Sequence, residues 1–436
     1  MNVRQLALSL LNEYEVGEKY VNLSLASHSA DKLTREERAS LTALLYTAVE
    51  RKITYDYYVC ALSGRSCESL DPYTRNILRL GMCQLVDMRS IPDYAAVNET
   101  VKLCRSPGER SFVNGVLRAA VRQKDSLPLP DEKKNYKRYL SVKYSFPLWI
   151  VKLLDEKFGR EETERLLHIF NTEKYTDLTV NTVKTSAMAV AERLRAQGYT
   201  VEECADVPIS LRIDRSVNPE CLSGFCEGEL FVQDRACIIS AMALAPEKGD
   251  LVIDTCACPG GKSFATAILM GDEGKILSFD LHDSKLPLIT EGAARLGLRS
   301  VTAEVCDATA PRTELFGKAD KVICDVPCSG LGVLGKKPDL RYKSEESVMA
   351  LPELQLSILE ASSRYLKVGG TILYSTCTLN SMENEAVVQR FLESHGDFEL
   401  SPFSVGTLAA EDGMLTLAPH LHGTDGFFMA KIIRKQ

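Results

Sequence analysis

The sequence lacks the features of a membrane or a secreted, disulfide-bonded protein. Its 436 residues contain no run of eighteen apolar residues, and its first residues lack the apolar core of a signal peptide. The 14 cysteines include no CxxC pair and are scattered through apolar patterns, unlike a disulfide framework or a zinc ribbon. We therefore expect a cytoplasmic protein with no membrane contact, no bound metal and mostly buried, reduced cysteines.

Low-complexity segments and internal repeats are also absent, and the composition is that of a globular chain. Apolar residues make up 45% and charged residues 25%, and the length suits two or three domains. The net charge of -7 is uneven: residues 1–174 carry 27 Lys and Arg against 23 Asp and Glu, and residues 175–436 carry 25 against 36. Nucleic-acid binding by the first part would depend on local patches, and a solvated mixed surface is the alternative.

Residues 1–125 follow a helical apolar period with few strand signals, which predicts an all-helical domain. Several basic residues in it could contact phosphates or could simply face solvent, namely Arg75, Arg79, Arg105, Arg110, Arg118 and Arg122. Residues 126–145 are charged and contain prolines, as linkers do. Residues 146–233 mix helical and strand patterns and predict a small α+β module.

From residue 234 to residue 436 helical and strand patterns alternate, which predicts an α/β Rossmann-type domain with a parallel, doubly wound sheet. The predicted strands are Leu251–Ile253, Lys275–Phe279, Val301–Val305, Lys321–Cys324, Thr371–Tyr374 and Phe427–Ile433. The predicted helices are Lys262–Met270, Lys285–Leu296, Ser347–Tyr365 and Met382–Ser394. Ligands of such sheets bind at the C-terminal ends of the strands.

The turn Pro259-Gly260-Gly261 joins the first of these strands to a helix, and it is the best candidate for a ligand loop. Two glycines allow close approach of the backbone, and the following helix offers amide donors. A Walker A loop would need glycine where the chain has Cys256, so that class is excluded. A GxGxxG fingerprint is missing as well, which argues against NAD and FAD.

Acidic residues follow the next three strands. Asp280 could accept hydrogen bonds from ribose hydroxyls, Asp307 could contact an adenine edge, and Asp325 ends the fourth strand. Each could instead be a helix cap or a turn residue. Their repetition at successive strand ends favours a shared binding role.

Two cysteines follow the fourth and fifth strands, Cys328 in Asp-Val-Pro-Cys-Ser-Gly and Cys377 in Ser-Thr-Cys-Thr. This placement suits a thiolate that attacks a substrate beside a cofactor, provided that the surroundings activate the thiol. Two buried structural cysteines are the alternative.

These motifs together resemble S-adenosylmethionine-dependent RNA cytosine-5 methyltransferases, and specifically the RsmB (Sun) branch, which acts on small-subunit ribosomal RNA. The resemblance is carried by residues 254–262, 325–342 and 375–385, with further matches at 231–234 and 425–430. Residues 1–125 resemble the NusB-like RNA-binding domain of that branch.

The resemblance implies that Cys377 is the nucleophile that adds to cytosine C6 and that Cys328 assists product release. It implies that S-adenosylmethionine is held by Cys256, Ala257, Cys258, Pro259, Gly260, Gly261, Lys262, Asp280, Asp307 and Asp325. The implied partner is small-subunit ribosomal RNA, with an unpaired or flipped target cytosine, and the implied assembly is a monomer. Residues 146–233 would be an RNA-binding module. Thr179, Arg235 and Cys258 depart from the residues usual in the family.

Two rival interpretations stay open at this point. In a DNA cytosine methyltransferase the nucleophile would be the cysteine of the Pro-Cys loop, Cys328. A non-catalytic RNA-binding or assembly factor could also keep the fold.

Overall fold

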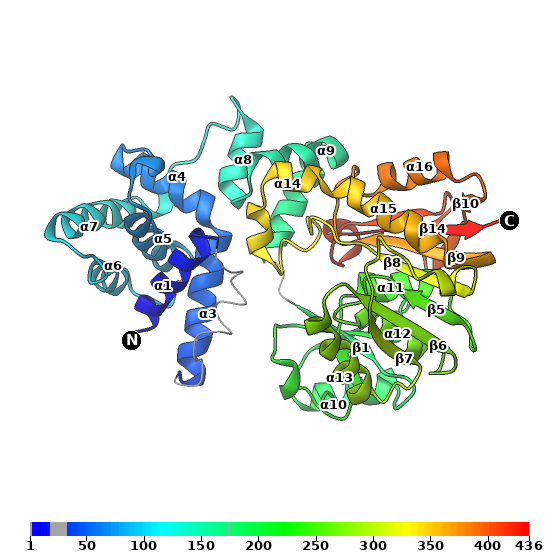
Figure 1. Ribbon diagram of the computed structural model, residues 1–436. Helices are drawn as coiled ribbons and strands as arrows, with labels where there is room; N and C mark the ends of the chain where they lie inside the picture. The colour runs from blue at the N-terminus through cyan, green and yellow to red at the C-terminus, as the bar shows by residue number, and fades with distance from the viewer. Residues whose placement is uncertain (1, 18–32, 173–174, 436) are drawn as a thin grey trace. The chain divides into compact units, whose positions relative to one another are not determined.

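The computed structural model describes residues 2–17, 33–172 and 175–435. The chain forms two compact units (Figure 1). One unit, here called the helical unit, comprises Met1–Asn171 and the separate segment Lys336–Tyr342. The other, here called the sheet unit, comprises Thr172–Gly335 and Lys343–Gln436.

The helical unit contains no strand among its described residues. Its helices and short 3-10 turns are α1 (Val3–Glu15), α3 (Arg35–Glu50), α4 (Lys52–Ser63), η2 (Cys67–Ser69), α5 (Pro72–Val86), α6 (Asp93–Val101), α7 (Pro107–Arg122), η3 (Lys124–Ser126), α8 (Tyr136–Tyr144), α9 (Leu148–Thr172) and η7 (Pro338–Tyr342). The helix α8 lies inside the segment 126–145 that was expected to be a linker. Side-chain caps start several helices, for example Asp71 before α5 and Ser106 before α7.

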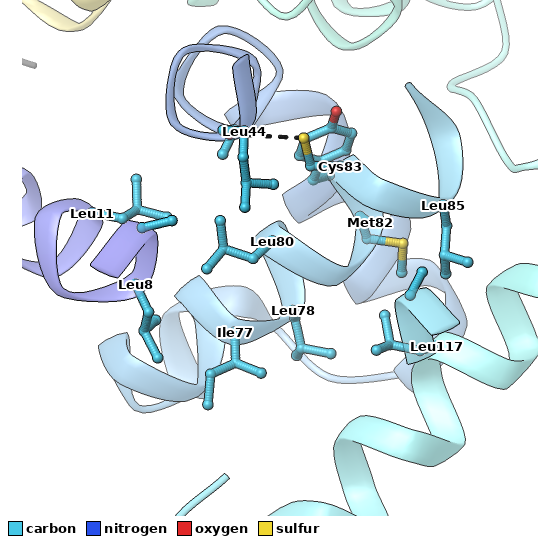
Figure 2. Close-up of a cluster of buried hydrophobic side chains, with 14 of the residues drawn as sticks. Leu8, Leu11, Leu44, Ile77, Leu78, Leu80, Met82, Cys83, Leu85 and Leu117 are labelled. Carbon is cyan, nitrogen blue, oxygen red and sulfur yellow. Dashed lines mark hydrogen bonds between the residues drawn. The ribbon is translucent and has the colours of Figure 1, made fainter. Parts of the chain in front are cut away.

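Helix α5 is the centre of this unit, because eleven of its fifteen residues are buried. Figure 2 shows its apolar side chains between Leu8 and Leu11 of α1, Leu44 of α3 and Leu117 of α7. Gly81 of α5 allows the close approach of α7, since a Cβ atom there would lie 2.7 Å from a methyl group of Leu117. Helix α5 therefore lies among the other helices of the unit, although it also carries the buried polar residues Asn76, Arg79 and Gln84.

Arg79 is the buried charge of this core. Its side chain is 2% exposed, and its guanidinium binds both carboxylate oxygens of Asp56 at 2.7 and 2.6 Å and also pairs with Glu15. Arg75 lies on the same carboxylate of Glu15, at 3.4 Å. Arg79 is therefore a structural residue and cannot be one of the phosphate contacts considered from the sequence, whereas Arg122 is exposed.

The sheet unit begins with a small antiparallel sheet in the order β2-β3-β1-β4. Its elements are β1 (Thr176–Val180), α10 (Ala187–Ala196), β2 (Val201–Glu203), β3 (Ser210–Ile213), η4 (Pro219–Cys221) and β4 (Leu230–Val232). Thr179, which departs from the family pattern, is buried and donates its hydroxyl to Gln233 at 3.0 Å. The threonine at position 179 therefore has a hydrogen-bond partner inside the sheet unit.

A larger sheet follows in the order β10-β14-β9-β8-β5-β6-β7, with β13 paired to β14. These strands are β5 (Leu251–Asp254), β6 (Lys275–Asp280), β7 (Val301–Val305), β8 (Ala319–Asp325), β9 (Leu366–Thr376), β10 (Phe398–Leu400), β13 (Met414–Leu417) and β14 (Phe427–Arg434), while β11 (Phe403–Val405) pairs with β12 (Leu408–Ala410). Strands β5 to β9 are mutually parallel, but β14 runs antiparallel to β9. The prediction of a parallel sheet holds for β5 to β9 but not for β14, because a strand pattern carries no information about direction.

Helices cover both faces of this sheet (Figure 1). They are α11 (Arg235–Leu244), α12 (Gly261–Leu269) and α13 (Leu286–Leu296) on one face and α15 (Leu351–Ser363) and α16 (Glu385–Ser394) on the other, with α14 (Glu345–Met349), α17 (Pro419–His422), η5 (Asp283–Lys285) and η6 (Thr313–Leu315) in the connections. Successive strand residues alternate between the two cores, as Val252 and Ile253 do. Strands that are buried on both faces read as continuous apolar runs, and this is why the sequence revealed them.

The fold class is confirmed: a helical N-terminal part, a small α+β module and an α/β sheet of the Rossmann type with helices on both faces. The predicted helix at 347–365 is interrupted at Ala350, between α14 and α15. Among the described residues, no helix has both the length and the apolar character required to cross a membrane.

Replacing Arg79 by Met should lower the free energy of unfolding of the helical unit by about 3 to 5 kcal/mol, because it leaves the carboxylates of Asp56 and Glu15 without their main buried partner. Denaturant unfolding followed by the fluorescence of Trp149 in α9, the single tryptophan, measures this. The control Arg122→Met removes an exposed arginine and should change stability by less than about 0.5 kcal/mol. Equal stability of the two variants would contradict the structural role.

Candidate active site

The site lies along one edge of the large sheet. Strands β8, β5, β6 and β7 are adjacent and parallel, so their C-terminal residues fall at the same edge. That edge carries Asp325, Asp254 and Asp280, with Asp307 two residues after β7. Strand β9 is parallel to β8 and ends directly before Cys377. The predicted residues of five strand ends are thereby brought to one place.

The turn after β5 is closed by its own backbone. Gly260 donates its N–H to Ala257 at 2.7 Å and has a φ of +106°, a conformation that favours glycine. A Cβ atom at Gly260 would lie 2.4 Å from the ring of Phe264. Helix α12 begins at the next residue, Gly261, so its first amides are at the edge of the sheet. Cys256 and Cys258 belong to this backbone turn.

Lys262 and Asp325 form a largely buried ion pair, with Nζ 2.6 Å from Oδ2. Asp325 Oδ1 also accepts a hydrogen bond from the Ser375 hydroxyl at 2.8 Å. Burial would lower the pKa of Lys262, but the charge of Asp325 outweighs burial and raises the pKa above its usual range. The ammonium is therefore a fixed positive charge, and it lies 5.0 Å from the ring centre of Phe427.

The other carboxylates differ in their surroundings. Asp280 Oδ1 accepts from the backbone N–H of His282 at 3.0 Å. Asp307 Oδ1 accepts from both the N–H and the hydroxyl of Thr309, so at least one of its oxygens serves a turn, as the alternative from the sequence allowed. Burial raises the pKa of Asp254 to about 7. Its Oδ2 accepts from Ser263 at 2.6 Å, while no described residue donates to its buried Oδ1.

Cys328 and Cys377 come together, with their sulfur atoms 3.3 Å apart. Both are half-buried. The hydrogen bond to Cys377, with burial as a further cause, raises the pKa of the Cys328 thiol well above its usual range. Two thiolates cannot share this space, so at least one of the two sulfurs carries a proton.

A buried carboxylate, Glu383, fixes the loops of both cysteines. It is fully buried and accepts from the Ser329 N–H at 2.8 Å and hydroxyl at 2.5 Å on the Cys328 side. It also accepts from Gln355 at 3.0 Å, from Asn380 at 3.0 Å and from Thr378 at 3.4 Å, the last directly after Cys377. We call this arrangement the Glu383 clamp.

Backbone contacts join the same loops. Gly332, in the Cys328 loop, donates its N–H to the Cys377 carbonyl at 2.9 Å and accepts from the N–H of Gly426 at 2.8 Å. A Cβ atom on Gly332 would lie only 1.9 Å from the Gly426 carbonyl oxygen, so no other residue fits. The glycines of the motif thus serve packing between loops.

Sequence reasoning located the cysteines and the glycine turn but missed their supports. The run Glu383-Asn384-Glu385 belongs to a motif after the fifth strand, but its letters do not show that the carboxylate of Glu383 is buried. Gln355 lies in α15 and gave no signal because nothing in the sequence connects it to the cysteine loops. In the described part of the chain, no group of three or more His, Cys, Asp or Glu residues could hold a metal ion.

Replacing Glu383 by Gln should destabilise the sheet unit by about 2 to 3 kcal/mol. A glutamine amide has a single acceptor oxygen, and its NH2 group would face donors that the second carboxylate oxygen now accepts from. Alkylation of Cys328 and Cys377 by iodoacetamide should accelerate as their loops loosen. Denaturant unfolding and mass spectrometry measure the two effects. The control Glu393→Gln, on the exposed surface of α16, should leave both unchanged. An unaltered Glu383→Gln variant would show that the clamp is not needed.

Comparisons with known families cover most of the chain. Residues 241–433 match the family described as 16S rRNA methyltransferase RsmB/F, and residues 1–122 match the NusB family. Residues 146–220 match the ferredoxin-like domain of RsmF/B-like methyltransferases.

Individual relatives agree over the full length. The chain is 34% identical to a probable ribosomal RNA small subunit methyltransferase B of Bacillus subtilis, covering 100% of this chain and 99% of that one. It is 36% identical to the protein of the same name from Synechocystis, covering 99% of each. The crystal structure of PH0851 superposes with a TM-score of 0.80 at 27% identity, covering 100% of this chain and 99% of that chain. A methyltransferase homologue from Pyrococcus horikoshii superposes with a TM-score of 0.60 at 27% identity, covering 69% of this chain and 99% of that chain. The resemblance inferred from the motifs is confirmed, and the chain belongs to the RsmB/F family of 16S rRNA methyltransferases.

Proposed function

We propose that this enzyme transfers a methyl group from S-adenosylmethionine to C5 of a cytosine in small-subunit ribosomal RNA, through a covalent adduct between Cys377 and cytosine C6. The observation that carries the proposal is the pair of sulfur atoms 3.3 Å apart, beside the glycine turn and the Lys262–Asp325 pair. The relatives named as small-subunit RNA methyltransferases support the substrate class.

The residues at the sheet edge suit S-adenosylmethionine. Asp254 Oδ1 is a buried acceptor to which no described residue donates, and an amino group of the cofactor could supply the missing donor. Asp280 offers a carboxylate at the end of β6, where ribose hydroxyls bind in Rossmann-type sheets. Residues 256–262 offer backbone amides and Asp307 and Asp325 further acceptors. We propose that these residues together hold the cofactor.

S-adenosylmethionine supplies an electrophilic methyl group, and the protein must make cytosine C5 nucleophilic. Lys262 interacts electrostatically with Cys377, and a nearby ammonium favours the thiolate of that cysteine. Cys328, whose pKa is raised, would then be the sulfur that keeps the proton and shares it with the Cys377 sulfur 3.3 Å away. These contacts support Cys377 as the nucleophile and Cys328 as the proton-bearing partner.

The reaction forms a covalent intermediate and then resolves it. The Cys377 thiolate forms a bond to C6, and the displaced π electrons make C5 a carbanion-like centre. C5 then takes the methyl group as the methyl–sulfonium bond breaks, and the electron pair of that bond stays on the sulfur of the departing S-adenosylhomocysteine. C5 then loses its proton to a base, and the electron pair left at C5 restores the ring double bond as the Cys377–C6 bond breaks. Cys328, 3.3 Å away, is placed to assist this release.

The target base must be accessible on both its C6 atom and its C5 atom. A cytosine stacked in a helix hides these atoms, so we propose that the substrate base is unpaired or flipped out. The NusB-like residues 1–122 and the ferredoxin-like residues 146–220 would supply contacts to phosphates and RNA shape.

Cys377→Ala should abolish methyl transfer, because no nucleophile is left to activate C5, whereas Cys328→Ala should accumulate a protein–RNA adduct. Transfer of labelled methyl groups to small-subunit RNA, followed by bisulfite mapping, measures the reaction and locates the base. The adduct appears as a slower band in a denaturing gel. Full activity of Cys377→Ala together with inactive Cys328→Ala would reverse the assignment and favour the mechanism of DNA cytosine methyltransferases.

Asp280→Asn should weaken binding of S-adenosylmethionine about tenfold or more, since a charged acceptor for the ribose hydroxyls becomes a neutral amide. Isothermal calorimetry measures the affinity. Asp283→Asn, three residues on and exposed, is the matched control and should bind as the wild type does. A wild-type protein that gives no heat with the cofactor would instead support a non-catalytic RNA-binding role.

A further inference from the structure

The segment Lys336–Tyr342 belongs to the helical unit although the chain on both sides of it belongs to the sheet unit. It follows the Cys328 loop, which ends at Gly335, and it precedes Lys343. We call it the anchored segment. It therefore connects the loop that carries Cys328 to the helical unit.

Arg341 holds the anchored segment. Its side chain is fully buried, and its guanidinium binds Asn171 Oδ1 at 2.8 Å and the Glu50 carboxylate at 3.3 Å. It also donates to the backbone carbonyl of Ser145 at 3.4 Å and stacks on the ring of Phe146 at 3.9 Å. Burial of a guanidinium costs several kcal/mol unless such partners compensate, so these contacts hold the Arg341 side chain in place.

Tyr342 fixes the end of the segment. Its hydroxyl donates to the carbonyl of Val49 at 2.8 Å, and the ammonium of Lys52 lies 4.8 Å from the centre of its ring. Two consecutive residues are therefore fastened to the helices α3, α4 and α9 and the turn that precedes α9. The backbone directly before Lys343 cannot move without breaking these contacts.

Lys343 holds the Cys328 loop. Its Nζ donates to the carbonyl of Ser329 at 3.1 Å and to the carbonyl of Cys328 itself at 3.4 Å. Lys343 is two residues from Arg341, and two residues of extended chain span at most about 7 Å. The position of the Cys328 backbone is thus tied through Lys343 to residues that are anchored in the helical unit.

We propose that the anchored segment positions the Cys328 loop for the reaction, with Arg341 and Lys343 as positioning residues that act through Cys328. This inference rests on the proposed function. It makes correct seating of the segment in the helical unit a condition for correct placement of the sulfur beside Cys377. A displacement of about 1 Å in such a site is enough to slow a reaction severely.

The test inserts two glycines between Tyr342 and Lys343, which keeps every side chain but loosens the connection, and compares this with Lys343→Met. Both variants should lower kcat about tenfold or more while KM for RNA and the affinity for S-adenosylmethionine stay within about twofold. Lys343→Arg, which keeps a donor, should retain most of the activity. Alkylation of Cys328 by iodoacetamide should accelerate severalfold in the insertion variant and in Lys343→Met.

The matched control is Lys337→Met, which removes the same charge from an exposed position of the anchored segment and should behave as the wild type. Denaturant unfolding verifies that all variants are folded. A kcat of the insertion variant within about twofold of the wild type overturns the inference. If the wild type itself transfers no methyl group, the proposed function fails, and the alkylation rates alone then decide whether the segment positions the loop: unchanged rates overturn it.

Discussion

The Glu383 clamp is the interaction on which the candidate site depends. A carboxylate with no solvent exposure is tolerable only if its lone pairs are filled, and here donors from the Cys328 loop, from the residues after Cys377 and from α15 fill them. The same carboxylate therefore satisfies its own burial and joins the two loops. Separating the loops would leave a buried charge without donors, which is why the distance between the sulfurs is well defined.

The sheet supplies the frame that the clamp completes. Parallel strands end at one edge, and each contributes one functional group there: the glycine turn after β5, Asp280 after β6, the Cys328 loop after β8 and Cys377 after β9. The antiparallel strand β14 pairs with the edge of β9 that faces away from β8. The turn before β14 packs Gly426 against Gly332. The strand whose direction the sequence did not reveal thus also supports the site.

Local patterns were sufficient to predict the large features. Apolar runs located the strands, the alternation of patterns indicated the α/β domain, and motif spacing brought Cys328 and Cys377 to adjacent strand ends. Features that depend on contacts between distant residues could not be predicted. Arg79 resembles any helix arginine until its carboxylate partners Asp56 and Glu15 are known, and Asp307 resembles a ligand contact until Thr309 is seen to occupy one of its oxygens. The anchored segment was part of a recognised motif, but nothing in its letters shows that Arg341 is buried among residues nearly 200 and 300 positions earlier.

The anchored segment also bears on how the chain is made. Ribosomes synthesise proteins from the N-terminus, and domains generally fold as units while the rest is still being produced. The helical unit cannot be completed in this way, because its last piece, Lys336–Tyr342, emerges only after four of the eight strands of the large sheet, β5 to β8, have been synthesised. Until then Glu50 and Asn171 lack their arginine. The helical unit consequently reaches its finished form only late in translation, and in a fragment that ends at residue 171 the side chains of Glu50 and Asn171 would never gain their arginine partner.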